Sequence, residues 1–141
     1  MQNLTQSIIP IPLVVELVWG ILTPLNITSE KAIKKIVVWS LYCQPGSKKK
    51  TALLDHISEV YHILNKRYNQ GLNWILAGDF NEWKVQKILE ISPKLKQVVT
   101  LPTCFDPPSI LDKIITSLHK YYQVPEIKPP LDNDPDKAGK P

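Results

Sequence analysis

Apolar positions along the chain fall into short runs that are separated by turn-forming residues. Residues 13–22 and 36–43 are rich in β-branched and aromatic side chains, and both runs are short enough to be strands. The second run, IVVWSLYC, is almost unbroken, which predicts a strand that is covered on both faces in the middle of a sheet. Residues 73–77, 97–101 and 110–116 are also predicted to be strands.

The apolar spacing changes to three and four residues between the second and third of these strands. This spacing predicts a helix over residues 51–68, and a shorter helix is expected over residues 83–91. His56 and His62 are expected on exposed or flanking faces of the first helix. The resulting order of strand, strand, helix, strand, helix, strand, strand predicts a layered domain of the α/β or α+β class.

The two ends of the chain differ from the part between them. Residues 1–12 are expected to form an irregular N-terminal lead, and residues 13–123 to form the folded domain. Residues 124–141 are rich in proline and lack an apolar period, so we expect an extended or disordered tail.

Composition and charge narrow the class of protein only slightly. A chain of 141 residues that is 43% hydrophobic and 21% charged can bury a core as one domain. The formal net charge of +4 is compatible with a polyanionic partner and equally with none. The apolar stretch over residues 8–25 is interrupted by prolines and Glu16, so neither a membrane span nor a signal peptide is expected.

The two cysteines, Cys43 and Cys104, belong to no CxxC or Cys/His arrangement. We therefore expect neither a zinc site nor a disulfide framework. We interpret both residues as reduced thiols of an intracellular protein. Both the cytoplasm and the nucleus are compatible with this interpretation.

The turn after the strand at residues 73–77 carries the first candidate chemistry. Asp79 and Asn81 lie in the sequence AGDFNEW, at a strand end, where α/β folds place ligands. The carboxylate can polarise a water or hold Mg²⁺, and the amide can donate to a phosphate oxygen. Gly-Asp-x-Asn is also good turn chemistry, so the spacing alone leaves a purely structural role open.

Three further features are candidates for function. Asp112 lies inside the apolar sequence ILDKIIT and must face solvent or have a buried partner, because an unpaired buried charge is costly. Tyr42 ends an apolar strand, where its phenol can reach a cleft or stay buried with a satisfied hydroxyl. Lys48, Lys49 and Lys50 form a basic run that can contact a phosphate backbone or simply be a solvated turn.

Four segments, taken together, resemble the endonuclease/exonuclease/phosphatase superfamily, and within it the endonuclease domains of non-LTR retrotransposons. The segments are VVWSLYCQPG, NWILAGDFN, VVTLPT and ILDKIIT, in this order and with similar gaps. The match covers the chain from about residue 14 to its end. It implies a partial four-layer α/β sandwich of the endonuclease/exonuclease/phosphatase type.

The resemblance also implies roles for the four polar residues. Asp79 matches the acid that orients or deprotonates the attacking water, and Asn81 matches the amide that contacts the scissile phosphate. Tyr42 matches a tyrosine that contacts the phosphate, and Asp112 matches an acid that pairs with a catalytic histidine. The implied cofactor is Mg²⁺, bound by residues that are not identified, and the implied partner is DNA.

The chain departs from the family pattern at both ends. The family carries an asparagine and a metal-binding glutamate on early strands and a terminal Ser-Asp-His motif, and we assign no counterpart to any of them. Neither Glu16 nor a histidine of this chain is assigned as a replacement. The resemblance therefore predicts an internal fragment of a retrotransposon-type polyprotein that is inactive or very weak alone, because catalytic groups that act as a unit are strongly interdependent.

Two alternatives stay open. The chain can be a non-catalytic binding module that keeps the fold, or a phosphoinositide or nucleotide phosphatase relative within the same superfamily. A partial sandwich would leave apolar faces uncovered, so we also expect self-association through residues 13–22 and 36–43.

Overall fold

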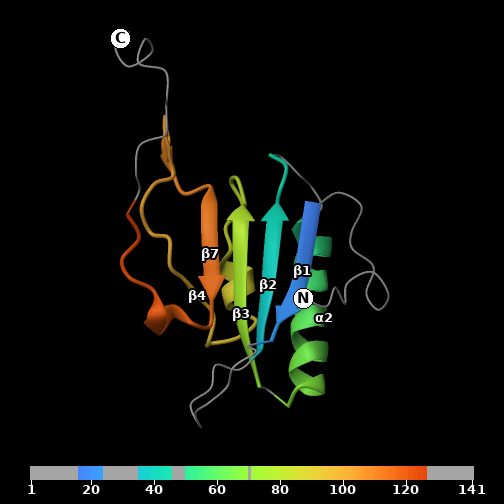
Figure 1. The fold of residues 1–141 in the computed structure, drawn as a ribbon. Coiled ribbons are helices and arrows are strands. Elements are labelled where there is room, and N and C mark those ends of the chain that lie inside the picture. The colour runs from blue at the N-terminus through green and yellow to red at the C-terminus, as the bar shows by residue number, and fades with distance from the viewer. Residues whose placement is uncertain (1–15, 24–34, 46–49, 70, 127–141) are drawn as a thin grey trace.

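A five-stranded mixed sheet organises the described part of the chain. The computed structural model describes residues 16–23, 35–45, 50–69 and 71–126. In spatial order, the strands of the sheet are β1 (Glu16–Leu22), β2 (Lys35–Tyr42), β3 (Leu72–Asp79), β7 (Asp112–Thr116) and β4 (Lys96–Gln97). Strands β2 and β3 run parallel, and every other neighbouring pair is antiparallel (Figure 1).

Two helices cover one face of this sheet. Helix α2 (Lys50–Arg67) connects the two parallel strands, as a parallel pair requires, and α3 (Gln86–Leu89) follows β3 (Figure 1). A hairpin of β5 (Cys104–Phe105) and β6 (Pro108–Ser109) precedes β7, and the 3₁₀ helix η1 (His119–Tyr121) follows it. The mixed α+β class predicted from the sequence is confirmed. No helix among the described residues is long and apolar enough to cross a membrane.

The strand boundaries differ from the predicted ones mainly after α3. The strand predicted over residues 97–101 is reduced to the two residues of β4, and the predicted loop before residue 110 contains the β5–β6 hairpin. The predicted lead over residues 1–12 and the tail beyond residue 126 lie outside the described residues. Short apolar runs next to prolines left these boundaries poorly specified.

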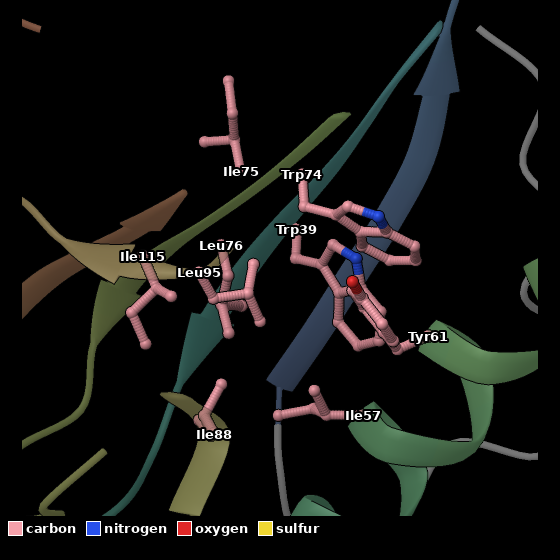
Figure 2. A pocket seen from close by; sticks show the side chains of 9 residues that line it. All are labelled: Trp39, Ile57, Tyr61, Trp74, Ile75, Leu76, Ile88, Leu95 and Ile115. Carbon is pink, nitrogen blue, oxygen red and sulfur yellow. The ribbon is translucent and has the colours of Figure 1, made fainter. Parts of the chain in front are cut away.

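Aromatic side chains form the centre of the core between the sheet and the helices. Trp19 of β1 and Trp39 of β2 are directly opposite one another, and their rings stack with centroids 5.6 Å apart. Trp74 of β3 lies 6.3 Å from Trp39, and Tyr61 of α2 lies 4.7 Å from Trp74. Figure 2 shows Trp39, Trp74 and Tyr61 on one side of a small cavity, with Ile88 and other aliphatic side chains on the other side. The centre of the core is therefore aromatic and aliphatic.

The opposite face of the sheet is more open. Val18 is 60% exposed, Ser40 is exposed, and Val38 and Ile114 are only partly buried. The prediction that both faces of the strand at residues 36–43 are covered is wrong for the described residues, because both described helices pack on the same face. Self-association through this face stays a prediction.

His56 corrects a second expectation. Its side chain is only 5% exposed, and its ring meets that of Trp39 edge-on at 6.1 Å. Burial lowers the pKa of His56, and the nearby Glu59 partly opposes this shift. The residue lies on the core-facing side of α2, so it is a packing residue and not a surface group.

Gly78 lets β2 and β3 approach one another at their carboxyl ends. It has a φ of +154°, and a Cβ atom added to it would lie 1.9 Å from the carbonyl oxygen of Leu41. Both the backbone conformation and the contact exclude any larger residue. The pairing that brings the last residues of the two strands together therefore depends on this glycine.

We expect Gly78→Ala to lower the free energy of unfolding by at least about 2 kcal/mol, because backbone of one strand must move away from the other. Urea denaturation followed by circular dichroism measures this loss. Gly71→Ala is the matched control, since its Cβ atom would meet only the carbonyl oxygen of Tyr68, at 3.0 Å. Equal, small losses in the two variants would contradict the assigned role of Gly78.

Candidate functional site

Polar side chains from separate strands form a row at one edge of the sheet. Tyr42 ends β2 and is directly opposite Asp79, which ends β3, and Asp79 is directly opposite Asp112, which begins β7. Directly opposed residues project from the same face of a sheet, and neighbouring strands lie about 5 Å apart. The structure thus brings three of the four predicted catalytic residues into one row, at the upper edge of the sheet in Figure 1.

The same row includes a residue that the sequence did not indicate. Glu16 begins β1 and is directly opposite Tyr42, with its side chain exposed. Tyr42 is 39% exposed, Asp112 is exposed, and Asp79 is partly buried. The open reading for Asp112 is therefore settled in favour of solvent, and the row is accessible to a ligand.

Asp79 and Asn81 form a tight turn at the end of β3. The backbone N–H of Asn81 donates to Oδ1 of Asp79 at 2.8 Å, which is the hydrogen bond of an Asx turn. Asn81 itself has a φ of +47°, a left-handed conformation that asparagine tolerates better than most residues. The turn chemistry of Gly-Asp-x-Asn is therefore present, and it occupies one of the two carboxylate oxygens of Asp79.

The side chain of Asn81 fastens this turn to the neighbouring strand. Its Nδ2 donates to the carbonyl oxygen of Cys43 at 2.6 Å, and the backbone N–H of Cys43 donates to the carbonyl oxygen of Asp79 at 2.9 Å. We call these two bonds the β2–β3 clasp. Asn81 thus lies close to the row, but its amide nitrogen has a structural partner in the protein.

Thr103 fixes the start of β7 and thereby the position of Asp112. Its Oγ1 accepts hydrogen bonds from the backbone N–H groups of Leu111 and Asp112, at 3.0 and 3.1 Å. The backbone N–H of Phe80 donates to the carbonyl oxygen of Leu111 at 2.8 Å and joins this segment to the end of β3. Thr103 was part of a segment that resembled the family, but no feature of the sequence indicated this role.

Lys113 is the buried cation of the site, and the sequence did not single it out. Its side chain is 7% exposed, and its Nζ donates to the carbonyl oxygen of Asn81 at 3.2 Å and lies 5.7 Å from the ring centre of Phe80. Burial lowers the pKa of Lys113, while the negative charges of Asp79 and Asp112 act to raise it. The position of this lysine within an otherwise apolar strand was the feature of the sequence that could have indicated its burial.

Cys43 lies directly behind the row and is only 1% exposed. Burial raises the pKa of its thiol; the charge of Asp79 acts in the same direction, and those of Lys50 and Lys113 oppose it. Both cysteines are free, as predicted. The buried Cys43 thiol therefore packs within the core.

The basic run is only partly described. Lys50 is the first residue of α2 and not part of a preceding loop, and it is close enough to Cys43 to affect its pKa. Lys48 and Lys49 lie outside the described residues. Their predicted contact with nucleic acid stays a prediction.

Among the residues that the structure describes, no three Asp, Glu, His or Cys side chains converge to hold a metal ion. None of the three histidines lies in the row, because His56 and His62 belong to α2 and His119 belongs to η1. The row therefore offers one directly opposed carboxylate pair, Asp79 and Asp112, the phenol of Tyr42 and, beside that phenol, the carboxylate of Glu16.

Comparison of this chain with known protein families, curated proteins and solved structures gives no match. The geometry of the row and the clasp therefore supplies the structural basis for a functional proposal.

We expect Asn81→Ala to lower the free energy of unfolding by about 2–3 kcal/mol, the sum of a lost hydrogen bond and the cost of a left-handed alanine. Asn81→Gly should lose only about 1 kcal/mol, because glycine adopts this conformation freely. Chemical denaturation of both variants separates the two contributions. Equal losses would show that the conformation of residue 81 carries no cost and would contradict the described turn.

Proposed function

We propose that this chain is a DNA endonuclease-like phosphodiesterase domain of the retrotransposon type, with its substrate phosphate at the Tyr42–Asp79–Asp112 row. The observation that supports the proposal is the register of the sheet. Residues from three strands that are separated along the chain meet in one accessible row, and they are the residues that the resemblance marks. Unrelated turn residues have no reason to meet in this way.

The chemistry of the row suits a phosphodiester. Hydrolysis requires an activated water, neutralisation of phosphate charge and stabilisation of the leaving oxygen. Asp79 has one carboxylate oxygen outside the Asx turn, which can accept a proton or a hydrogen bond from water. The Tyr42 hydroxyl can donate to a phosphate oxygen, because it lies on the adjacent strand at the same level.

Asp79 and Asp112 also fit Mg²⁺, which proteins hold through one or two carboxylates together with water and substrate phosphate. Two carboxylates directly opposite one another repel, and a divalent cation between them would relieve this repulsion. When bound there, the ion would neutralise charge on the phosphate. We propose weak or no turnover for the chain, because the described row offers no histidine to assist the leaving oxygen.

The fold proposal follows from the same resemblance. We propose that the five-stranded sheet, with its helices on one face and partly exposed apolar residues on the other, is half of a two-sheet sandwich. Val18, Val38 and Ile114 would then form part of the contact between the sheets. Self-association through the same residues is the expected consequence when this face is left uncovered.

A non-catalytic nucleic-acid-binding module is the second candidate function, and one observation favours it. The Nδ2 of Asn81 donates to the carbonyl oxygen of Cys43, so one of the two N–H donors of the amide that the resemblance assigns to the phosphate is already used within the protein. A domain with this clasp can keep the row for binding without performing the reaction.

The proposal predicts that the chain binds a fluorescent DNA duplex with an affinity that rises when Mg²⁺ is added. Tyr42→Phe should weaken binding about tenfold, because a hydrogen bond to a charged phosphate is lost. Asp79→Asn should abolish the gain from Mg²⁺. Ser40→Ala is the matched control, since Ser40 is exposed on the same strand and the same face, and it should change nothing. Fluorescence anisotropy measures all four proteins.

Plasmid nicking in Mg²⁺ distinguishes the two candidate functions. We expect no robust nicking by the wild type. Robust nicking that Asp79→Ala removes would show an active enzyme at the proposed site. DNA binding that is unaffected by Mg²⁺, Tyr42→Phe and Asp79→Asn would overturn the proposed function altogether.

A further inference from the structure

A groove opens beside the Asp79–Asn81 turn, and the largely buried side chain of Lys113 forms part of its lining. One wall is the turn over residues 81–84, and the other wall is the β5–β6 hairpin with the segment that leads into β7. The groove is lined by Pro45, Asn81, Glu82, Trp83, Lys84, Cys104, Pro107, Ser109, Ile110, Leu111 and Lys113. Tyr42, Asp79 and Asp112 do not line it, so the groove is adjacent to the row and distinct from it.

The ammonium group of Lys113 is incompletely satisfied within the protein. It has three N–H donors, and one hydrogen bond is present, to the carbonyl oxygen of Asn81. Among the described residues it forms no ion pair with a carboxylate. Only 7% of the side chain is exposed, so water replaces the missing partners poorly. A buried cation in this state is costly to keep unless something else uses its charge.

The other lysine of the groove indicates that the ligand is negatively charged. Lys84 is exposed at the turn and carries a second positive charge to the same lining, against the single carboxylate of Glu82. Apolar surface from Trp83, Ile110 and Leu111 completes the walls. A groove with two cations and apolar walls suits an anion that is attached to a partly apolar chain, as in a nucleic-acid strand.

We propose that Lys113 and Lys84 form an anion site that binds a backbone phosphate of a DNA strand, next to the phosphate held at the Tyr42–Asp79–Asp112 row. This inference rests on the proposed function and deepens it, because it extends the binding surface from the row into the groove. The hydrogen bond from the Lys113 ammonium to the carbonyl oxygen of Asn81 ties this cation to the Asp79–Asn81 turn. The β5–β6 hairpin forms the far wall that confines the strand.

The test is the salt dependence of duplex binding. Fluorescence anisotropy measures the binding constant at KCl concentrations from about 50 to about 300 mM. Each phosphate contact contributes about 0.9 to the slope of log K against log salt. Lys113→Met should therefore reduce the magnitude of the slope by about 0.9. Lys113→Arg, which keeps the charge, should restore most of it.

Lys35→Met is the matched control. Lys35 also places its ammonium over an aromatic ring, 5.1 Å from the centre of Tyr68, but it begins β2 at the opposite end of the strand from Tyr42. Its removal lowers the net charge by the same amount and should leave the slope unchanged. Thermal melting of each variant verifies that it is folded. An equal change of slope in Lys35→Met and Lys113→Met would overturn the site, because it would report net charge alone.

A second measurement applies to the wild type and requires no variant. The ¹³Cε signal of Lys113 should shift when the duplex is added, and the signal of Lys35 should not. Absence of a Lys113 shift in a protein that binds DNA would overturn the anion site and leave the proposed function standing. If the duplex does not bind but inorganic phosphate shifts Lys113, the proposed function fails and the site binds free phosphate instead of a strand. If neither shifts it, both fail.

Discussion

The parallel pairing of β2 with β3 is the constraint on which the candidate site depends. It brings Tyr42 opposite Asp79, although the whole of α2 separates the two residues along the chain. The pairing continues past the strand ends through the β2–β3 clasp, in which the backbone N–H of Cys43 donates to Asp79 and the side chain of Asn81 donates to the carbonyl oxygen of Cys43. It is possible only because Gly78 presents no side chain to the backbone of Leu41. The candidate site thus lies next to the position at which β3 requires a glycine against β2.

A second constraint follows from the antiparallel partner of β3. The register of β7 sets Asp112 opposite Asp79, and two like charges in this position repel. Lys113 occupies the neighbouring position, and its buried ammonium group lies close enough for Asp79 and Asp112 to favour its charged form. Thr103 then holds the start of β7 through two backbone N–H groups, and this fixes the backbone of Asp112.

Much of this could be predicted from the sequence, and the exceptions have physical causes. The alternation and length of the apolar runs predicted β1, β2, β3 and α2, because periodicity reports directly on burial. The candidate residues Asp79 and Asp112 were also found, since acids at the ends of apolar strands are conspicuous. Their alignment was not predictable from composition or periodicity, because the register depends on pairing between segments that are distant along the chain.

The burial of Lys113 and of His56 was not evident from the sequence for a related reason. Sequence patterns assign charged and titratable residues to the surface, and both side chains are buried by contacts with other elements of the fold. His56 packs on Trp39 of the sheet, and Lys113 packs on Phe80 of the turn. The short β4 and the β5–β6 hairpin likewise depend on tertiary context, because two-residue strands carry no period that a sequence can reveal.

The central claim is that the ends of β2, β3 and β7 form one phosphate-binding surface. NMR chemical-shift mapping of the chain with a short DNA duplex in Mg²⁺ tests it most directly. We expect the largest changes at the amides of Tyr42, Asp79 and Asp112, with smaller changes along the adjacent groove. Changes that are confined to α2 or to the opposite end of the sheet, with none at these three residues, would contradict the account.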